Sequence, residues 1–389
     1  MKNIFLALIT LITFSCKAQQ QNSKVITDHI LGNPKFVKEY VIFLNNSGPF
    51  TFMKGDSEYG HSIMMTPRSL RASMKGTWFE TDFCRYINNE TYYDRNQKIV
   101  KETWFYKSGE IVDDHNYTYD ILGRLVKESS KNRYSKDSLL FFYEGNKKEV
   151  KFEKSYYKWK NDPVKININN FESEKPLLIT KFDTLSKTDS IFTVTNDIWR
   201  KVGERSYTRG KDSIYQKKLS RIKIYNNNYK VIEEKTFNYE DDHENKKIYL
   251  TEHTKYEYNE FGNLIKQSNI KDGKFYSYTM LGKGKIISEE KKANTGKTWY
   301  EMYVYDRDQR LERRTSYYDD KIQGDIRFEY KENYISKLHY LEIYDENKVA
   351  EPKIIIFKYK FDKHKNWTEV IKNVNGKDLY KWVREIKYY

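Results

Sequence analysis

The chain has 389 residues and a formal net charge of +15, with 32% charged and 38% hydrophobic residues. Six prolines exclude a proline-rich low-complexity chain, and two cysteines exclude a disulfide scaffold. The 35 tyrosines and 21 phenylalanines favour half-buried pleated surfaces, whereas alanine, the best helix former, occurs five times. This composition predicts β-sheets with one wet face rather than a thick globular core.

The positive charge does not by itself identify a partner. Lysines are spread along the whole chain and alternate with acids at nearly every predicted strand, without a run of five basic residues. An anionic glycan, lipid headgroups or nucleic acid would all be attracted by such a balance. A solvated sheet face is the favoured interpretation, and we expect no nucleic-acid partner.

The first fifteen residues are typical of a signal peptide. Lys2 supplies a positive charge, and the apolar run from Ile4 to Phe14, about 11 residues, is too short for ~30 Å of hydrocarbon. The small Ser15 then precedes Cys16, and this ending resembles the lipobox of bacterial lipoproteins. In that family the cysteine is acylated and the chain is cut before it. The resemblance implies lipidation at Cys16 and an anchor in the cell envelope, with the outer membrane favoured over the inner.

Starts of this kind, a relaxed lipobox followed by Lys-Ala-Gln, resemble those of Bacteroidota lipoproteins. The alternative is an ordinary cleaved signal with an accidental cysteine. The sequence has no other run of about 18 apolar residues, so it predicts no membrane-spanning helix. If Cys16 carries lipid, Cys84 has no partner cysteine, and the exported fold must be held by its core alone.

Residues 16–85 fit no repeat and are expected to form a lipidated N-terminal segment and an irregular cap. Ser57-Glu58-Tyr59-Gly60-His61-Ser62 indicates irregular structure, and a short helix is expected near residues 66–74. Exposed sheet edges invite aggregation, so we expect this segment to cover the first edge of the following sheet.

A short pattern recurs along the rest of the chain, from residue 86 to residue 389. It occurs at residues 91–100, 117–126, 256–265, 303–311 and 359–367, with a weaker copy at 225–231. Four of the copies have aromatic residues at alternate positions, and each copy has an Asp or Asn, a turn, and an apolar residue that starts a return strand. The residues expected to form the strands and turns are Tyr93, Asp94, Tyr119, Asp120, Gly123, Tyr258, Asn259, Gly262, Tyr305, Asp306, Phe361 and Asp362.

This pattern predicts a β-hairpin. Alternate tyrosines face one side of a strand, and an Asp or Asn opens the turn by bonding backbone amides two residues further on. Gly123 and Gly262 are expected to take positive φ at the end of the turn, with Asn96 and Asn366 in the same role in other copies.

Between residues 135 and 220 the pattern is replaced by a polar Asp-Ser corner before an apolar strand, at 136–140, 188–192 and 211–215. This too predicts a turn followed by a strand. The sequence therefore predicts an all-β array of hairpin repeats that forms an elongated, twisted antiparallel sheet, degenerate over residues 135–220.

The copy Tyr-x-Tyr-Asp-x-x-Gly-Arg-Leu at residues 117–125 resembles the YD repeat of RHS-type proteins. The resemblance covers residues 90–370 loosely, and two copies keep the turn glycine. In that family hairpins join side by side into a long curling sheet, which large members close around a toxin domain. No toxin-like domain follows Trp367. The resemblance implies a fold and not an activity.

No pattern in the sequence indicates catalysis, a cofactor or a metal. His243 and His253 flank an acidic stretch that would suit a divalent cation, but a solvated hairpin loop is the favoured interpretation. Asp113-Asp114-His115 is interpreted in the same way. Cys84 is expected to be a buried small hydrophobe rather than a reactive thiol beside Arg85. The aromatic side chains offer platforms for sugar rings, although most are expected to cover the buried face of the sheet.

The leading functional hypothesis is a membrane-anchored, non-catalytic lipoprotein, a scaffold or binding module whose sheet engages a protein or a glycan. One alternative is an immunity-type lipoprotein that neutralises a toxin. Another is a periplasmic glycan hydrolase with carboxylate catalysis, which requires two acids at about 5–10 Å in a cleft.

Overall fold

The computed structural model describes residues 30–45, 67–106, 108–132, 134–160, 162–170, 177–203, 206–242, 245–271, 274–292, 296–343 and 351–389. Cys16, the stretch 57–62 and His243 lie outside these residues. The described chain contains 23 strands and one helix.

The helix is α1 (Pro67–Glu80). The strands are β1 (Pro34–Phe43), β2 (Asn88–Tyr93), β3 (Ile99–Phe105), β4 (Ile111–Tyr119), β5 (Leu125–Asn132), β6 (Ser135–Tyr143), β7 (Val150–Trp159), β8 (Lys165–Asn170), β9 (Leu177–Asp183), β10 (Thr188–Gly203), β11 (Ser206–Tyr225), β12 (Val231–Asp242), β13 (Asn245–Tyr258), β14 (Leu264–Lys271), β15 (Lys274–Gly282), β16 (Lys285–Lys292), β17 (Thr298–Tyr305), β18 (Leu311–Tyr318), β19 (Lys321–Lys331), β20 (Tyr334–Glu342), β21 (Lys353–Phe361), β22 (Trp367–Val374) and β23 (Lys377–Tyr388).

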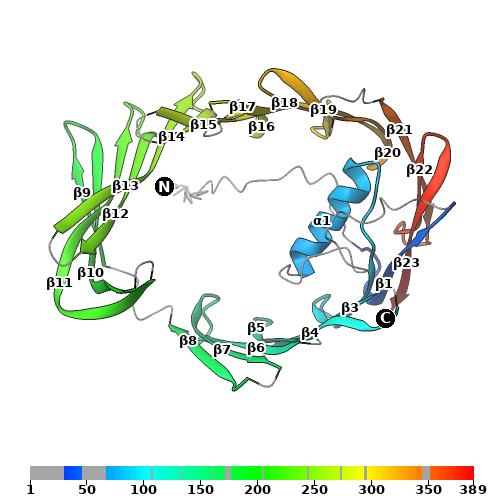
Figure 1. The fold of residues 1–389 in the computed structure, drawn as a ribbon, viewed down its shortest axis with the longest axis horizontal. Coiled ribbons are helices and arrows are strands. Elements are labelled where there is room, and N and C mark those ends of the chain that lie inside the picture. The colour runs from blue at the N-terminus through cyan, green and yellow to red at the C-terminus, as the bar shows by residue number, and fades with distance from the viewer. Residues whose placement is uncertain are drawn as a thin grey trace, which may run out of the picture.

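All 23 strands belong to one antiparallel sheet, so the predicted all-β hairpin array is confirmed. Strands next to one another in the chain pair in sequence, and Figure 1 shows the sheet bending into a ring. Within the described residues, β8 pairs only with β7 and β9 only with β10, so the ring is open between them.

Strand β1 joins the two ends of the hairpin array. It pairs with β2 on one side and with β23 on the other, where Tyr40 lies opposite Val383. Residues 34–43 were expected to belong to an irregular cap, and that expectation was wrong, because an extended strand satisfies both neighbouring edges with backbone hydrogen bonds. The sheet edge is covered, as predicted, but by a strand.

The curvature of the ring has a repeated local cause. In each strong copy of the repeat the register between the two strands shifts at the aromatic residue that precedes the turn. These residues are Tyr93, Tyr119, Tyr258, Tyr305 and Phe361. A β-bulge bends its strand and increases the local twist, so bulges at equivalent positions bend successive hairpins in one direction.

The helix α1 lies inside the ring, against β20, β21, β22 and β23 (Figure 1). The indole of Trp78, which is fully buried, meets Trp382 edge-on at 5.3 Å between ring centroids, and Phe79 meets Phe357 at 5.4 Å. Cys84 is also fully buried there, which raises the pKa of its thiol, as a structural rather than a reactive cysteine requires. The apolar core therefore occupies one end of the ring.

Candidate ligand-binding face

The recurrent turns share one hydrogen-bonding pattern. In the copy at Asp120, the Gly123 amide donates to the Asp120 carbonyl at 2.9 Å, and the Asp120 carboxylate accepts from the Arg124 amide at 2.8 Å. Gly123 and Gly262 both adopt φ +75°. The same bonds recur at Asp94, Asn226, Asn259, Asp306 and Asp362.

Two of the expected positive-φ residues were assigned wrongly. The residues that take the glycine position are Gln97, at φ +65°, and Lys365, at φ +67°, rather than Asn96 and Asn366. The turn length fixes this position, because the residue four after the tyrosine must turn left-handed whatever its side chain. Asn366 instead bonds Leu31, with its amide oxygen accepting from the Leu31 amide at 2.8 Å.

Tyrosine hydroxyls join each hairpin to the one before it. The aromatic residue before the turn donates to the carbonyl of the first or second residue of the preceding return strand: Tyr119 to Ile99 at 2.9 Å and Tyr258 to Val231 at 2.8 Å. Further examples are Tyr143 to Leu125, Tyr305 to Ile286 and Tyr330 to Leu311. Where the copy has Phe361, the bond comes from the earlier tyrosine of that copy, Tyr359, to Ile335.

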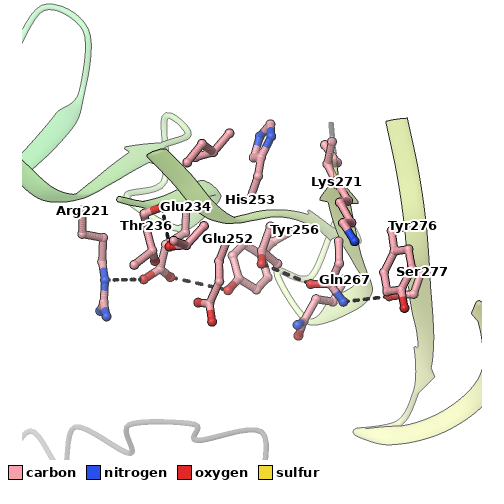
Figure 2. A pocket seen from close by; sticks show the side chains of 15 residues that line it. Arg221, Glu234, Thr236, Glu252, His253, Tyr256, Gln267, Lys271, Tyr276 and Ser277 are labelled. Carbon is pink, nitrogen blue, oxygen red and sulfur yellow. Dashed lines mark hydrogen bonds and ion pairs between the residues drawn. The ribbon is translucent and has the colours of Figure 1, made fainter. Parts of the chain in front are cut away.

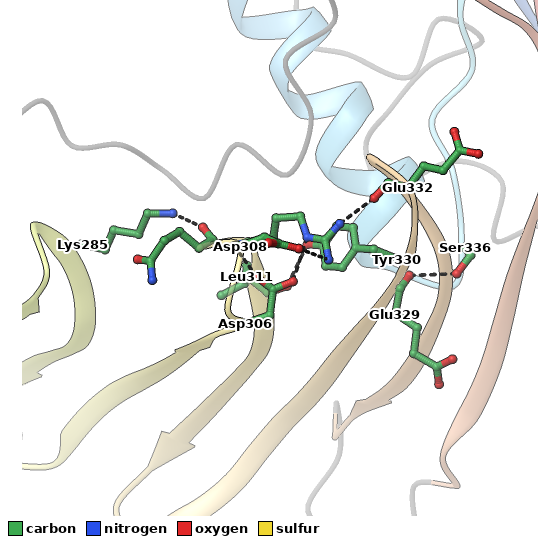
Figure 3. A network of polar contacts seen from close by, with 10 residues as sticks. Lys285, Asp306, Asp308, Leu311, Glu329, Tyr330, Glu332 and Ser336 are labelled. Atoms are coloured by element: carbon green, nitrogen blue, oxygen red, sulfur yellow. Dashed lines mark hydrogen bonds and ion pairs between the residues drawn. The ribbon is translucent and has the colours of Figure 1, made fainter.

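Basic side chains make a second link between neighbouring turns. Lys98 Nζ donates to the Gly123 carbonyl at 2.6 Å and lies 4.9 Å from the centroid of the Tyr119 ring. Figure 3 shows two more such links, from Lys285 to the turn at 306–310 and from that turn to Glu332. We call this connected edge the turn rim; its turns are at 94–98, 120–124, 144–149, 184–187, 226–230, 259–263, 283–284, 306–310, 332–333 and 362–366. The predicted repeat residues therefore form the strands and turns of the sheet rather than a pocket.

The inner face of the ring is the face that carries α1, as shown by Arg314, whose guanidinium donates to Glu80 of the helix at 2.8 Å. Following the register from Arg314 across the sheet to β11 identifies the inner residues of the other strands. They are almost all polar: Arg221, Glu234, Thr236, Thr254, Tyr256, Gln267, Asn269, Ser277, Thr279, Glu289, Glu301 and Tyr303. Figure 1 shows α1 at the opposite end of the ring from β11, β12 and β13, so among the described residues no helix covers this wall.

A shallow groove of about 720 Å³ lies on this wall (Figure 2). The Thr254 hydroxyl donates to the Asn269 amide oxygen at 3.2 Å, and the Asn269 amide donates to the Ser277 hydroxyl at 3.0 Å. The groove is lined by Arg221, Glu234, Thr236, Leu250, Thr251, Glu252, His253, Thr254, Tyr256, Gln267, Asn269, Ile270, Lys271, Tyr276 and Ser277. It therefore offers donors, acceptors and two tyrosine rings beside the aliphatic side chains of Leu250 and Ile270.

The titratable side chains of the groove are held in states that favour hydrogen bonding over nucleophilic attack. Burial and the nearby Glu234 carboxylate raise the pKa of Tyr256 to about 12, so its hydroxyl stays neutral. Arg221 Nε lies 3.1 Å from Glu234 Oε1, and His253 Nε2 lies 2.7 Å from Glu233 Oε1. His253 lies in β13 and is thus paired with a residue of the neighbouring strand β12. Among the described residues, no three His, Cys, Asp or Glu side chains are grouped to hold a metal ion.

A second polar group lies on the inner face of β3 to β6. Register places Glu102, His115, Ser130 and Asp137 opposite one another on successive strands, with Asp113 beside them. Asp113-Asp114-His115 was interpreted as a solvated loop, and this was wrong, because these residues lie within β4. Side chains two residues apart in a strand point to the same face, so the sequence could have indicated that Asp113 and His115 lie on one face.

Burial determines the ionisation of this second group. It raises the pKa of both Asp113 and Asp137 and lowers the pKa of His115, so each shift favours the neutral form. Glu102 is committed to the protein itself, since it accepts from Arg71 at 2.7 Å and from the Trp104 indole at 2.8 Å. The side chains of this second group can form hydrogen bonds and exchange protons. The ion pair between Glu102 and Arg71 connects the group to α1.

Comparisons with known proteins identify no family. The chain matches no protein-family profile and no curated protein. Among solved structures, a porin-like protein from Bacteroides uniformis is similar over 92% of this chain and 99% of its own, with 10% sequence identity and a TM-score of 0.19. A likeness at that TM-score carries no inference about this chain. In the part of the chain that the structure describes, no helix has the length and apolar character needed to cross a membrane.

Proposed function

We propose that this protein is a lipid-anchored, non-catalytic binding module that holds a glycan on the open inner wall of its ring. The observation that carries the proposal is the groove on β11 to β15, where amide, hydroxyl and charged groups lie beside Tyr256 and Tyr276. The lipobox-like Cys16 supports the anchor, and the exported location follows from it.

The composition of the groove favours a glycan over a protein partner. Polar side chains on neighbouring strands are spaced by about 4.8 Å, which suits hydroxyl groups along a sugar chain, and tyrosine rings offer a face to a sugar ring. Protein partners bind through apolar or aromatic anchors that fill desolvated pockets. This groove is shallow, so it does not offer a desolvated pocket for such an anchor.

The test is binding of the purified protein to a panel of oligosaccharides, measured by calorimetry. Tyr256→Ala and Asn269→Ala should each weaken binding at least tenfold, because they remove an aromatic face and a hydrogen-bonding amide. Tyr317→Ala, which changes a tyrosine on the outer face, should bind like the wild type. If no oligosaccharide binds, or if all three variants bind like the wild type, the glycan proposal is wrong.

The non-catalytic part of the proposal is tested separately on the row at β4 to β6. Asp113→Asn and Asp137→Asn should leave oligosaccharide binding unchanged, and the wild type should release no new reducing ends. Turnover that is lost with either substitution would instead support the glycan hydrolase considered above.

A further inference from the structure

We propose that the turn rim docks on an anionic phospholipid surface, with its apolar turn tips placed among the lipid headgroups. The rim is not part of the groove, so this site is additional to glycan binding. Three observations carry it: the exposure of apolar tips, the basic residues beside them, and the place where the chain enters the fold.

Apolar side chains at several turn tips are exposed to solvent. Ile121 is 102% exposed, Leu185 96% and Phe261 80%, and Leu122 and Tyr229 are more than half exposed. The turn pattern does not require them, because the equivalent tips carry Arg95-Asn96 at one turn and Arg307-Asp308 at another. Apolar side chains that no packing explains, gathered on one edge, are typical of an interaction surface.

Basic side chains lie between these tips. Lys98 and Arg124 flank the tip at Ile121 and Leu122, reaching the carbonyls of Gly123 and Gly145. Lys230 reaches the turn that carries Phe261 through the Gly262 carbonyl. Lysine and arginine at the level of apolar tips complement lipid phosphates, as in helices that lie at membrane interfaces.

The described chain begins on this rim. The Leu31 amide and carbonyl both bond the Asn366 side chain, at 2.8 and 2.9 Å, within the turn at 362–366. From Cys16 to Ile30 is 14 residues (30 − 16), which span at most ~50 Å when extended. An anchor at Cys16 would therefore hold the rim, rather than a far part of the fold, close to the bilayer. This third observation rests on the proposed function, whereas the first two do not.

The experiment uses the chain from Lys17 onward, which keeps every described residue but lacks the lipidation site. Flotation with vesicles of phosphatidylcholine and phosphatidylglycerol should carry the protein upward, and binding should fall as salt rises above ~0.15 M. The triple variant Ile121→Ser, Leu122→Ser, Phe261→Ser should bind at least tenfold more weakly. The matched control Met302→Ser, Val304→Ser, Ile354→Ser changes exposed apolar residues of the outer face and should bind like the wild type.

The outcomes separate this inference from the glycan proposal. The tip variant should keep its affinity for an oligosaccharide that the wild type binds, since the groove lies elsewhere. No binding to anionic vesicles by the wild type would overturn the docking inference and leave glycan binding intact. Equal loss of vesicle binding in the tip and outer-face variants would overturn it too, because the rim would then have no special role.

Discussion

Lys372 is the least expected charged residue of the fold. It is fully buried beneath the end of α1, where its Nζ donates to the carbonyls of Thr77 at 3.1 Å and Phe83 at 2.6 Å. Thr77 lies in the last turn of the helix, whose carbonyls lack intrahelical donors and carry partial negative charge, and Phe83 lies three residues beyond the end of the helix. Burial lowers the pKa of Lys372 to about 7. The amine thus satisfies the helix end, but its charged form is disfavoured.

This shift predicts a pH dependence of stability. The unfolded chain, with an ordinary lysine pKa near ~10.4, binds more protons than the folded chain between pH 7 and about 10. The free energy of unfolding should therefore rise with pH from 7 to about 8, as measured by melting temperature; above ~8.5 the raised pKa of the buried Cys84 thiol opposes the rise. Lys372→Met should flatten that rise, while Lys358→Met, at a half-exposed lysine, should keep it. Parallel slopes in all three proteins would contradict the assignment.

Gly123 and Gly262 are needed for the backbone conformation of their turns, because both adopt φ +75°. Gly123→Val and Gly262→Val should each cost ~1–2 kcal/mol or more of the free energy of unfolding, and Gly→Asn should cost less. Either side chain must displace the lysine above it, Lys98 or Lys230, so the difference between Val and Asn isolates the backbone term. Urea denaturation measures it, and equal costs would show that positive φ is not needed.

At the scale of elements, hairpins are held to one another by tyrosine hydroxyls as well as by the backbone ladder. Tyr359 is the most enclosed example, and burial raises the pKa of its hydroxyl, which donates to the Ile335 carbonyl at 2.8 Å. The alternation of tyrosines and the turn residues predicted the hairpins from the sequence, because both are local signals. The inter-hairpin bond was not predictable, since it depends on the register between strands and joins residues 18 to 27 positions apart in the sequence.

Tyr359→Phe and Tyr119→Phe should each lower the free energy of unfolding by about 1 kcal/mol, because a buried carbonyl loses its donor while the ring is kept. Tyr229→Phe, at an exposed turn tip, is the matched control and should change stability little. Urea denaturation of the three variants measures the difference. If Tyr229→Phe costs as much as the other two, the hydroxyl bonds do not stabilise the array.

At the scale of the whole molecule, the sequence predicted one long antiparallel sheet but not its return on itself. The bulges that bend it occur at the predicted tyrosines, yet nothing local indicates that β1 meets β23, where Tyr40 and Glu385 bond at 3.0 Å across 345 residues. The position of α1 and of the open inner wall depends on that closure. The candidate groove could therefore not be predicted from the sequence, although the alternation of polar residues along its strands is visible there.

The anchor is tested on the whole molecule. Cys16→Ala should release the protein from membranes or leave it uncut, because no thiol remains to be acylated. Fractionation and the apparent mass of the mature chain measure both effects. Cys84→Ala is the control, since that thiol is buried in the core and should not affect anchoring. Normal processing and membrane retention of the Cys16→Ala protein would rule out the lipoprotein assignment.

The double pairing of β1 has a consequence for the order in which the protein matures. A chain that emerges from its amino end produces β1 first, yet one of its two edges must wait for β23, the last strand to be made. Contacts so distant in sequence form slowly, and an unpaired edge meanwhile invites association with other chains. Every intermediate length of this protein therefore leaves one edge of β1 open, and a copy cut short before residue 377 would keep that edge open permanently, in addition to the edges of β8 and β9. The pairing of both edges of β1 is thus completed only by the final twelve-residue strand.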